Sequence, residues 1–209
     1  MIEADRSVEA TFPLSPMRWV VLAIFSTMSL LQSLIWLTFG AIEADAQEVF
    51  SMDASTVTIL AMYGPIWYQL MAFPMMEVYR RYGLRITCLL GAFFDLLCGI
   101  ARCFALGKTT GSIVALHFGQ AFNGLNGPIV LGFPTELSMT WFPTHERGFA
   151  TAVALLANSL GAMVGFLWLP WSVETLGMIP MLRITGAVSL VLFLVMLFCF
   201  PHAPPSPPS

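Results

Sequence analysis

The chain has 209 residues, of which 57% are hydrophobic and only 10% are charged. Because a globular domain carries about 25% charged residues, this chain has too few charges to cover a surface that faces water. Its net charge of −3 excludes the basic surface of a nucleic-acid-binding protein, so no nucleic-acid partner is expected.

Six apolar runs follow one another along the chain, each long enough to cross a hydrocarbon core of about 30 Å as a helix. They cover residues 17–39, 54–78, 86–106, 113–139, 149–171 and 179–200. The sequence therefore predicts an all-α integral membrane protein with six transmembrane helices within residues 17–200. Residues 1–16 are predicted to form a cytoplasmic N-terminal segment, and residues 201–209 a Pro-rich cytoplasmic tail.

The first run carries a stripe of polar and small side chains at helical spacing. Gln32 and Trp36 belong to it, four residues apart and therefore on one face of a helix. We take Gln32 as a candidate solute contact. The depth of Trp36 is compatible with the aromatic belt at a membrane interface.

Two ionisable residues, Asp95 and Arg102, lie at membrane depth in the third run. Burying a charge in lipid is costly, so such residues are functional candidates by default. The two share a helical face with Gly99 but lie roughly 10 Å apart along the axis, too far for a direct bond. We expect Arg102 to extend to the outer interface. Asp95 either carries a coupling proton or is a neutral acid bonded to a neighbour.

Four polar residues, His117, Gln120, Asn123 and Asn126, lie in the fourth run. They spread over about half of the helix surface, more than one packing seam needs, which favours a wall facing water or solute. Amide side chains also hold membrane helices together without binding any solute. We favour cavity lining for Gln120 and Asn126, with Asn123 as a further candidate.

A stripe of small residues in the fifth run includes Gly161 and Gly165, the two ends of a GxxxG step. Small residues let two helix backbones approach closely. The stripe predicts a packing face, either within this chain or against a partner.

The sequence carries no signal of an enzyme. It shows no nucleotide-binding loop, no nucleophile–base pair and no paired carboxylates at an accessible site. Its four cysteines form no CxxC pair, and no histidine cluster has metal-ligand spacing. We therefore predict that the chain is not an enzyme and has no catalytic residue, no metal site and no cofactor.

The distribution of lysine and arginine predicts the orientation in the membrane. With a cytoplasmic N-terminus, the inner side holds Arg6, Arg18, Arg80, Arg81, Arg85 and Arg147, and the outer side holds Arg102, Lys108 and Arg183. Basic residues favour the cytoplasmic side, so both termini are predicted to be cytoplasmic.

Two motifs stand at run boundaries on the predicted cytoplasmic side. Between the second and third runs, the segment RRYGLR (80–85) resembles the D-R-x-G-x-R loop of the major facilitator superfamily. After the fourth run, the segment WFPTHER (141–147) is similar to a W-F-x-x-x-E-R signature of several branches of that superfamily. Both lie where the superfamily has them, between helices two and three and between helices four and five.

Finer matches resemble solute carrier family 49, which includes the feline leukaemia virus subgroup C receptor-related and the disrupted-in-renal-carcinoma-protein-2-like transporters. These matches are QSLIWLTFG (32–40), YGLRIT (82–87), Arg102-Cys103 and GQAFNGLNGPIV (119–130). The resemblance extends from about residue 18 to 200, but only to the N-terminal half of a twelve-helix transporter. It implies two inverted three-helix repeats and a solute site that faces the second half.

The resemblance also implies roles for single residues. Trp36 would face a cationic or aromatic solute, and Asn126 would correspond to an amide in the solute cavity. Arg80 stands where the loop motif usually has Asp, so Glu77 would have to brace the gate in its place. The residues of this cytoplasmic gate would be Glu77, Arg81, Gly83, Arg85, Glu146 and Arg147.

By this resemblance, the chain is expected to be a secondary-active transporter, or half of one, for a small organic solute. That solute would be a cationic or vitamin-like metabolite, such as an amine alcohol or pyridoxine, with proton coupling through Asp95. The expected partners are the solute, the lipid bilayer, and either a C-terminal six-helix half or a second copy of the chain. The alternative is a non-transporting interaction protein, or a truncated isoform, that binds a full-length transporter through the stripe in the fifth run. The membrane would be lysosomal or the plasma membrane.

Overall fold

The computed structural model describes residues 15–205, and within that range it contains helices and no strand. The helices are α1 (Met17–Trp36), α2 (Thr38–Ala41), α3 (Glu43–Phe50), α4 (Ala54–Cys103), α5 (Thr110–Gly132), α6 (Pro134–Trp141), α7 (Arg147–Leu176) and α8 (Met178–Cys199). The predicted cytoplasmic segment 1–16, apart from its last two residues, lies outside the described residues, as do the last four residues of the predicted tail.

Four helices of the described chain are long and apolar enough to cross a membrane: α1, α4, α7 and α8. The helix α5 is not among them, although it lies in the fourth apolar run. The all-helical membrane class is therefore confirmed, whereas the number of spans stays a prediction.

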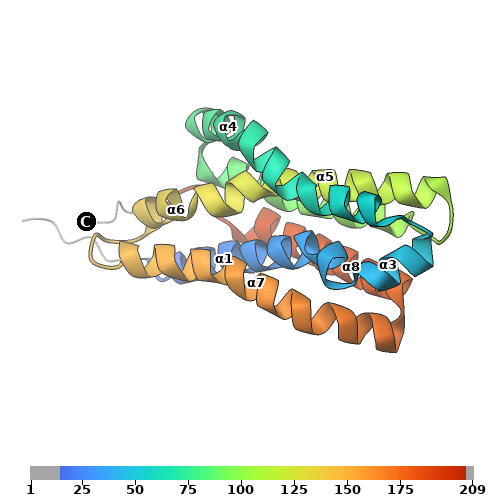
Figure 1. Ribbon diagram of the computed structural model, residues 1–209. Coiled ribbons are helices and arrows are strands. Elements are labelled where there is room, and N and C mark those ends of the chain that lie inside the picture. The colour runs from blue at the N-terminus through green and yellow to red at the C-terminus, as the bar shows by residue number, and fades with distance from the viewer. Residues whose placement is uncertain (1–14, 206–209) are drawn as a thin grey trace, which may run out of the picture.

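The second and third apolar runs form one continuous helical stretch of 50 residues, α4, broken only at Gly83. The prediction of a loop between residues 78 and 86 is corrected here, because helical residues reach Gly83 from both sides. Gly83 has φ 78° and ψ 177°, a conformation that is available to glycine but strained for other residues. A single glycine therefore replaces a longer loop, and the ribbon of α4 turns back beside α5 (Figure 1).

Two other boundaries differ from the prediction in the same way. The first run ends as a helix at Trp36 and continues through the short α2, and the fourth run divides into α5 and α6 at Phe133. Pro134 is the first residue of α6. A proline has no N–H to donate, so it fits the start of a helix, where that donor has no intrahelical partner.

The helices run alongside one another, with α1 between α5 and α7 and with α8 behind it (Figure 1). The second half of α4 packs on α5 and on α8. Met17, Arg85 and Phe198 line one shallow pocket, so the start of α1, the turn in α4 and the end of α8 lie at the same end of the bundle.

The small-residue stripe of α7 lies against α1. A Cβ atom added at Gly161 would overlap the backbone of Leu30, and one added at Gly165 would lie 3.5 Å from Leu34 Cα. The sequence left open whether this face packs within the chain or against a partner. In the structure it packs within the chain, against α1.

Candidate functional site

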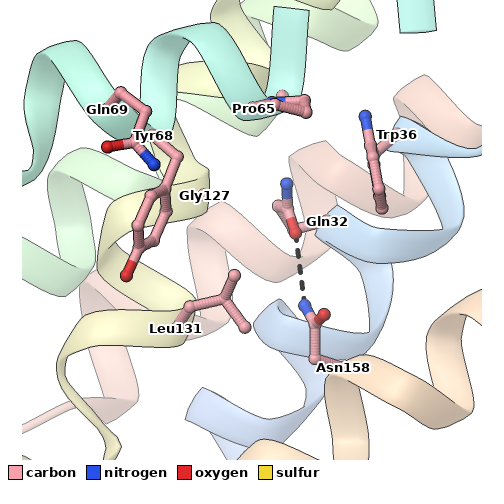
Figure 2. A pocket seen from close by; sticks show the side chains of 9 residues that line it. Gln32, Trp36, Pro65, Tyr68, Gln69, Gly127, Leu131 and Asn158 are labelled. Carbon is pink, nitrogen blue, oxygen red and sulfur yellow. Dashed lines mark hydrogen bonds between the residues drawn. The ribbon is translucent and has the colours of Figure 1, made fainter. Parts of the chain in front are cut away.

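A pocket of about 270 Å³ lies among four helices, and nine residues line it. They are Gln32 and Trp36 of α1, Gly64, Pro65, Tyr68 and Gln69 of α4, Gly127 and Leu131 of α5, and Asn158 of α7. Figure 2 shows Trp36 on one side of the pocket, Tyr68 and Leu131 on the other, and Gln32 and Asn158 between them.

Regular helix geometry explains most of this lining. Gln32 and Trp36 are separated by four residues on α1, as are Gly127 and Leu131 on α5, so each pair lies on one helix face. Pro65 lies inside α4, where it removes one backbone hydrogen bond.

None of the nine lining residues carries a formal charge. Asn158 Nδ2 donates to Gln32 Oε1 at 3.3 Å and to Ser29 O at 3.0 Å, which fixes both amides at the pocket wall. Trp36 Nε1 donates to Ala61 O at 3.1 Å. The polar edge of the indole is therefore bonded to the protein, and the ring of Trp36 is the part that the pocket offers to a solute.

Directly behind this wall lies the carboxyl group of Asp95, which is fully buried. Asn123 Nδ2 donates to Asp95 Oδ1 at 3.1 Å, and Asn126 Nδ2 donates to Asp95 Oδ2 at 2.8 Å. Asn123 Nδ2 also donates to Gln32 O at 3.1 Å. One amide therefore links the buried carboxyl group to a residue of the pocket.

The side chain of Arg102 is also buried, with 1% of its surface exposed. The guanidinium donates to Ile35 O at 3.0 Å, to Thr38 Oγ1 at 3.2 Å and to Gln120 Oε1, and it lies over the ring of Phe39. The expectation that Arg102 extends to an interface is therefore wrong. Carbonyl groups in the last turn of a helix lack intrahelical donors, and the end of α1 supplies such an acceptor inside the bundle.

The three amides of α5 lie behind the pocket wall. Gln120 Nε2 donates to Trp36 O at 3.2 Å and to Leu60 O at 3.3 Å, so it joins α1 to α4. Asn123 and Asn126 bind the carboxyl group of Asp95, and none of the three belongs to the lining. Direct contact of these amides with a solute stays a prediction, whereas the structure brings them together as a support for α1 and α4.

The sequence reasoning missed several lining residues. Tyr68 and Gln69 follow the Gly-Pro interruption in the second run, which was a signal that α4 departs from regular packing there. Asn158 belongs to the stripe of α7. Gly127, the neighbour of Asn126, has no side chain that could have drawn attention to it.

The residues of the predicted gate lie at the end of the bundle near the turn in α4. Glu77 pairs with Arg81 at 2.5 Å and with Arg80 at 3.8 Å, all within one helix and largely exposed. Gly83 forms the turn itself. Contact of Glu77 with an opposite half stays a prediction.

The remaining gate residues bind within the chain. Arg85 donates to Leu197 O at 3.0 Å, near the C-terminal end of α8. Glu146 pairs with Arg18 at 3.1 Å, which joins the start of α7 to the start of α1. Arg147 donates to a carbonyl group five residues before it. The first motif is therefore bonded to the end of α8, and the second motif to the start of α1.

Comparison with known proteins agrees with this fold. The chain is 34% identical over 210 residues to the Solute carrier family 49 member 4 homolog of Xenopus laevis, covering 92% of this chain and 46% of that protein. It is 29% identical over 217 residues to the Choline/ethanolamine transporter FLVCR1 of Mus musculus, covering 94% and 38%. The chain thus spans less than half the length of these curated relatives. Both are named as carriers or transporters rather than enzymes, in agreement with the prediction.

A family-level match covers almost the whole chain. The profile described as Major Facilitator Superfamily matches residues 20–209. Together with the relatives in solute carrier family 49, this match confirms the resemblance seen in the two motifs. The chain belongs to the major facilitator superfamily.

Proposed function

We propose that the chain is one half of a secondary-active transporter for a small organic solute. In this proposal it forms six spans: α1 with α2, the two parts of α4 on either side of Gly83, α5 with α6, α7, and α8. The spans form two inverted three-helix repeats, both termini are cytoplasmic, and the membrane is lysosomal or the plasma membrane. The chain represents the N-terminal half, and the second wall of the solute site comes from a C-terminal half or from a second copy.

The pocket among α1, α4, α5 and α7 is the observation that carries this proposal. It combines the rings of Trp36 and Tyr68 with the amides of Gln32, Gln69 and Asn158, and none of its lining residues is charged. Aromatic faces attract cations, and neutral amides supply acceptors without a competing counter-ion. Such a wall suits an amine alcohol or a vitamin-like base. The mouse relative, named a choline/ethanolamine transporter, supports choline and ethanolamine as first candidates.

The position of Asp95 supports proton coupling. Its two carboxyl oxygens accept from Asn123 and Asn126, and Asn123 also holds the backbone of Gln32 at the pocket. A proton added to this carboxyl group would turn one acceptor into a donor, and at least one of the two amides would have to change its bond. Protonation of Asp95 would therefore change the hydrogen bonds that hold Gln32 at the pocket.

Exposed apolar side chains on the first part of α4 support a second wall. Ile66, Leu70 and Phe73 have 51%, 57% and 85% of their surface exposed, and they follow the pocket residue Pro65 along the helix. A partner half that completes the pocket would cover this face, and lipid would cover it otherwise.

Binding and uptake of radiolabelled choline, ethanolamine and pyridoxine test the proposal. The purified chain in lipid nanodiscs should bind one of them, and vesicles containing the chain should take it up faster with a proton gradient. Asn158→Leu should weaken binding, because it removes a pocket amide and the bond to Gln32. Thr175→Ala, at an exposed threonine bonded only within α7, is the matched control and should bind normally. If the chain binds none of the three solutes, the proposal is wrong for this chain.

The second candidate is the non-transporting interaction protein. The stripe of Gly161 and Gly165 that was expected to bind the partner is occupied by α1, so this function would have to use another exposed apolar face, such as that of α4. Co-purification with a full-length relative, combined with no solute binding by the chain, would favour this candidate over the first.

A further inference from the structure

Pro65 of α4 and the indole of Trp36 meet at one carbonyl group. In a regular helix, Ala61 O would accept the N–H of residue 65, but that residue is a proline and has no N–H to donate. Trp36 Nε1, from α1, donates to the same Ala61 O at 3.1 Å. The indole therefore takes the place of the missing donor.

Gly64 provides the room for this contact. A Cβ atom added at Gly64 would lie 2.5 Å from Trp36 Nε1 and 2.9 Å from two ring carbons. Any larger residue would have to displace the indole from the groove of α4. The adjacent pair Gly64-Pro65 thus supplies both a free acceptor and the space to reach it.

The backbone of Trp36 is held as well. Gln120 Nε2 donates to Trp36 O, and Arg102 donates to Gln120 Oε1 and to Ile35 O. With its carbonyl group bound on one side and its indole N–H on the other, the tryptophan has little freedom to turn its ring. Pre-organisation of this kind improves binding because less motion is lost when a solute arrives.

We propose that Pro65 and Gly64 are positioning residues for Trp36: the proline frees a backbone acceptor for the indole N–H, and the glycine lets the ring approach it. The ring face presented to the pocket is then fixed by α4, and a movement of the α4 backbone at Ala61 would turn the ring. The effect on solute affinity rests on the proposed function, whereas the contact itself does not.

Nuclear magnetic resonance of the tryptophan side chains in the ligand-free chain tests the contact. The chain has six tryptophans, and Trp36→Phe identifies the signal of Trp36 by its loss. In Pro65→Ala, the restored N–H of residue 65 competes for Ala61 O, so the Trp36 signal should move upfield and exchange faster with water. Pro74→Ala, the same change further along α4, is the matched control and should leave that signal in place. An unchanged Trp36 signal in Pro65→Ala would overturn the proposal.

Gly64→Ala gives a second test should Pro65→Ala fail to fold. Its new methyl group must push the indole aside, so the Trp36 signal should shift while that of Trp19, which packs on Phe142 and Phe149, stays in place. A Trp36 signal that does not move in Gly64→Ala would contradict the contact in the same way.

Solute binding then tests the consequence. Pro65→Ala and Trp36→Phe should each weaken binding about twofold to tenfold, the range that corresponds to one hydrogen bond. The double variant should bind no more weakly than Trp36→Phe. A phenyl ring cannot donate a hydrogen bond, so it gains nothing from the acceptor Ala61 O that Pro65 leaves free. If the loss of affinity in the double variant equals the product of the losses in the two single variants, the positioning role is overturned. If the unmodified chain binds no solute, the proposed function fails, and the resonance experiment still decides whether the contact exists.

Discussion

The two parts of α4 are similar in apolar content but differ in what they contact. The first part, up to Gly83, contributes four residues to the pocket and leaves Phe73 with 85% of its surface exposed. The second part buries Asp95 and Arg102 almost completely against α5 and the end of α1. The first part faces the pocket and carries its charged residues, Glu77, Arg80 and Arg81, on an exposed surface near Gly83. The second part places Asp95 and Arg102 in the interior of the bundle.

The cost of burying charge explains this difference. A charged group inside an apolar bundle needs several hydrogen-bond partners, or it destabilises the fold. Asp95 obtains two amide donors, and Arg102 obtains three acceptors. These bonds hold both side chains inside the bundle, away from the pocket, whose lining carries no charge. In this bundle, the two charged residues of the third apolar run are therefore bound to neighbouring helices and do not belong to the pocket lining.

Replacement of Arg102 should have the largest effect on stability. Arg102→Met keeps much of the volume of the side chain but leaves Gln120 Oε1 without its donor, whereas Ile35 O still accepts from Thr38 Oγ1. A buried acceptor left unpaired costs about 1 to 3 kcal/mol, and the buried carboxyl group of Asp95 also loses the attraction of the Arg102 charge, so we expect a loss of about 3 kcal/mol. Thermal unfolding in detergent, followed by tryptophan fluorescence, measures it.

Arg81→Met is the matched change in the first part of α4. Arg81 pairs with Glu77, but the two side chains are 67% and 46% exposed, and such pairs contribute about 0 to 1 kcal/mol. Equal losses in the two variants would show that the two parts of α4 do not differ as the structure indicates.

Gly99→Ala should have the next largest effect. A Cβ atom at Gly99 would lie 2.6 Å from Gly186 Cα of α8, and the backbone of α8 cannot move aside as a flexible side chain can. Overpacking of this kind costs about 1 to 3 kcal/mol. In the control Gly148→Ala, the new methyl group meets no atom within 4 Å, so the same unfolding measurement should show no loss. A neutral Gly99→Ala would mean that α4 and α8 pack less closely.

A smaller effect is expected for Asp95→Asn. The new amide offers one acceptor instead of two, so Asn123 or Asn126 must find another partner. Within the described chain, Asn126 Oδ1 is buried and has no hydrogen-bond partner, so a rotated Asn126 amide would accept from the new side chain. We therefore expect a loss of only about 1 kcal/mol.

Uptake measurements on the same variant sharpen the proposal of proton coupling. The amide side chain in Asp95→Asn does not titrate as a carboxyl group does, so any remaining uptake should no longer respond to a proton gradient. Uptake by this variant that keeps the full gradient response would exclude the carboxyl group of Asp95 as the coupling site. Asp45→Asn, at an exposed residue of α3, provides the control.

The helices could be predicted because a membrane requires long apolar segments whose backbone bonds are satisfied internally. The boundaries at Gly83 and Phe133 could not, since composition does not show whether a segment between two runs forms a loop or continues the helix. At Gly83, a single positive φ angle replaced the expected loop.

The candidate site shows a similar limit. Gln32 and Trp36 were placed on one stripe from spacing alone, and the structure brings both to the pocket. Spacing also grouped the amides of α5, but it does not show which neighbour each helix face meets. Asn123 and Asn126 meet the carboxyl group of Asp95, and Arg102 meets a carbonyl group at the end of α1. These are contacts between distant segments, and they determine which polar residues line a cavity and which support it.

The smallest expected effect concerns Asp53, at the exposed start of the first part of α4. Hydrogen bonds from Ser55 and Thr56 lower the pKa of Asp53 from 3.8 to about 2. Because the carboxylate form is favoured in the folded chain, its contribution to stability is complete above about pH 4 and is lost as the pH falls toward about 2. The stability difference between the unmodified chain and Asp53→Ala should therefore shrink over that interval. Unfolding measured at several pH values between about 5 and about 2.5 checks it, and a difference that stays constant would show that the carboxylate does not cap α4.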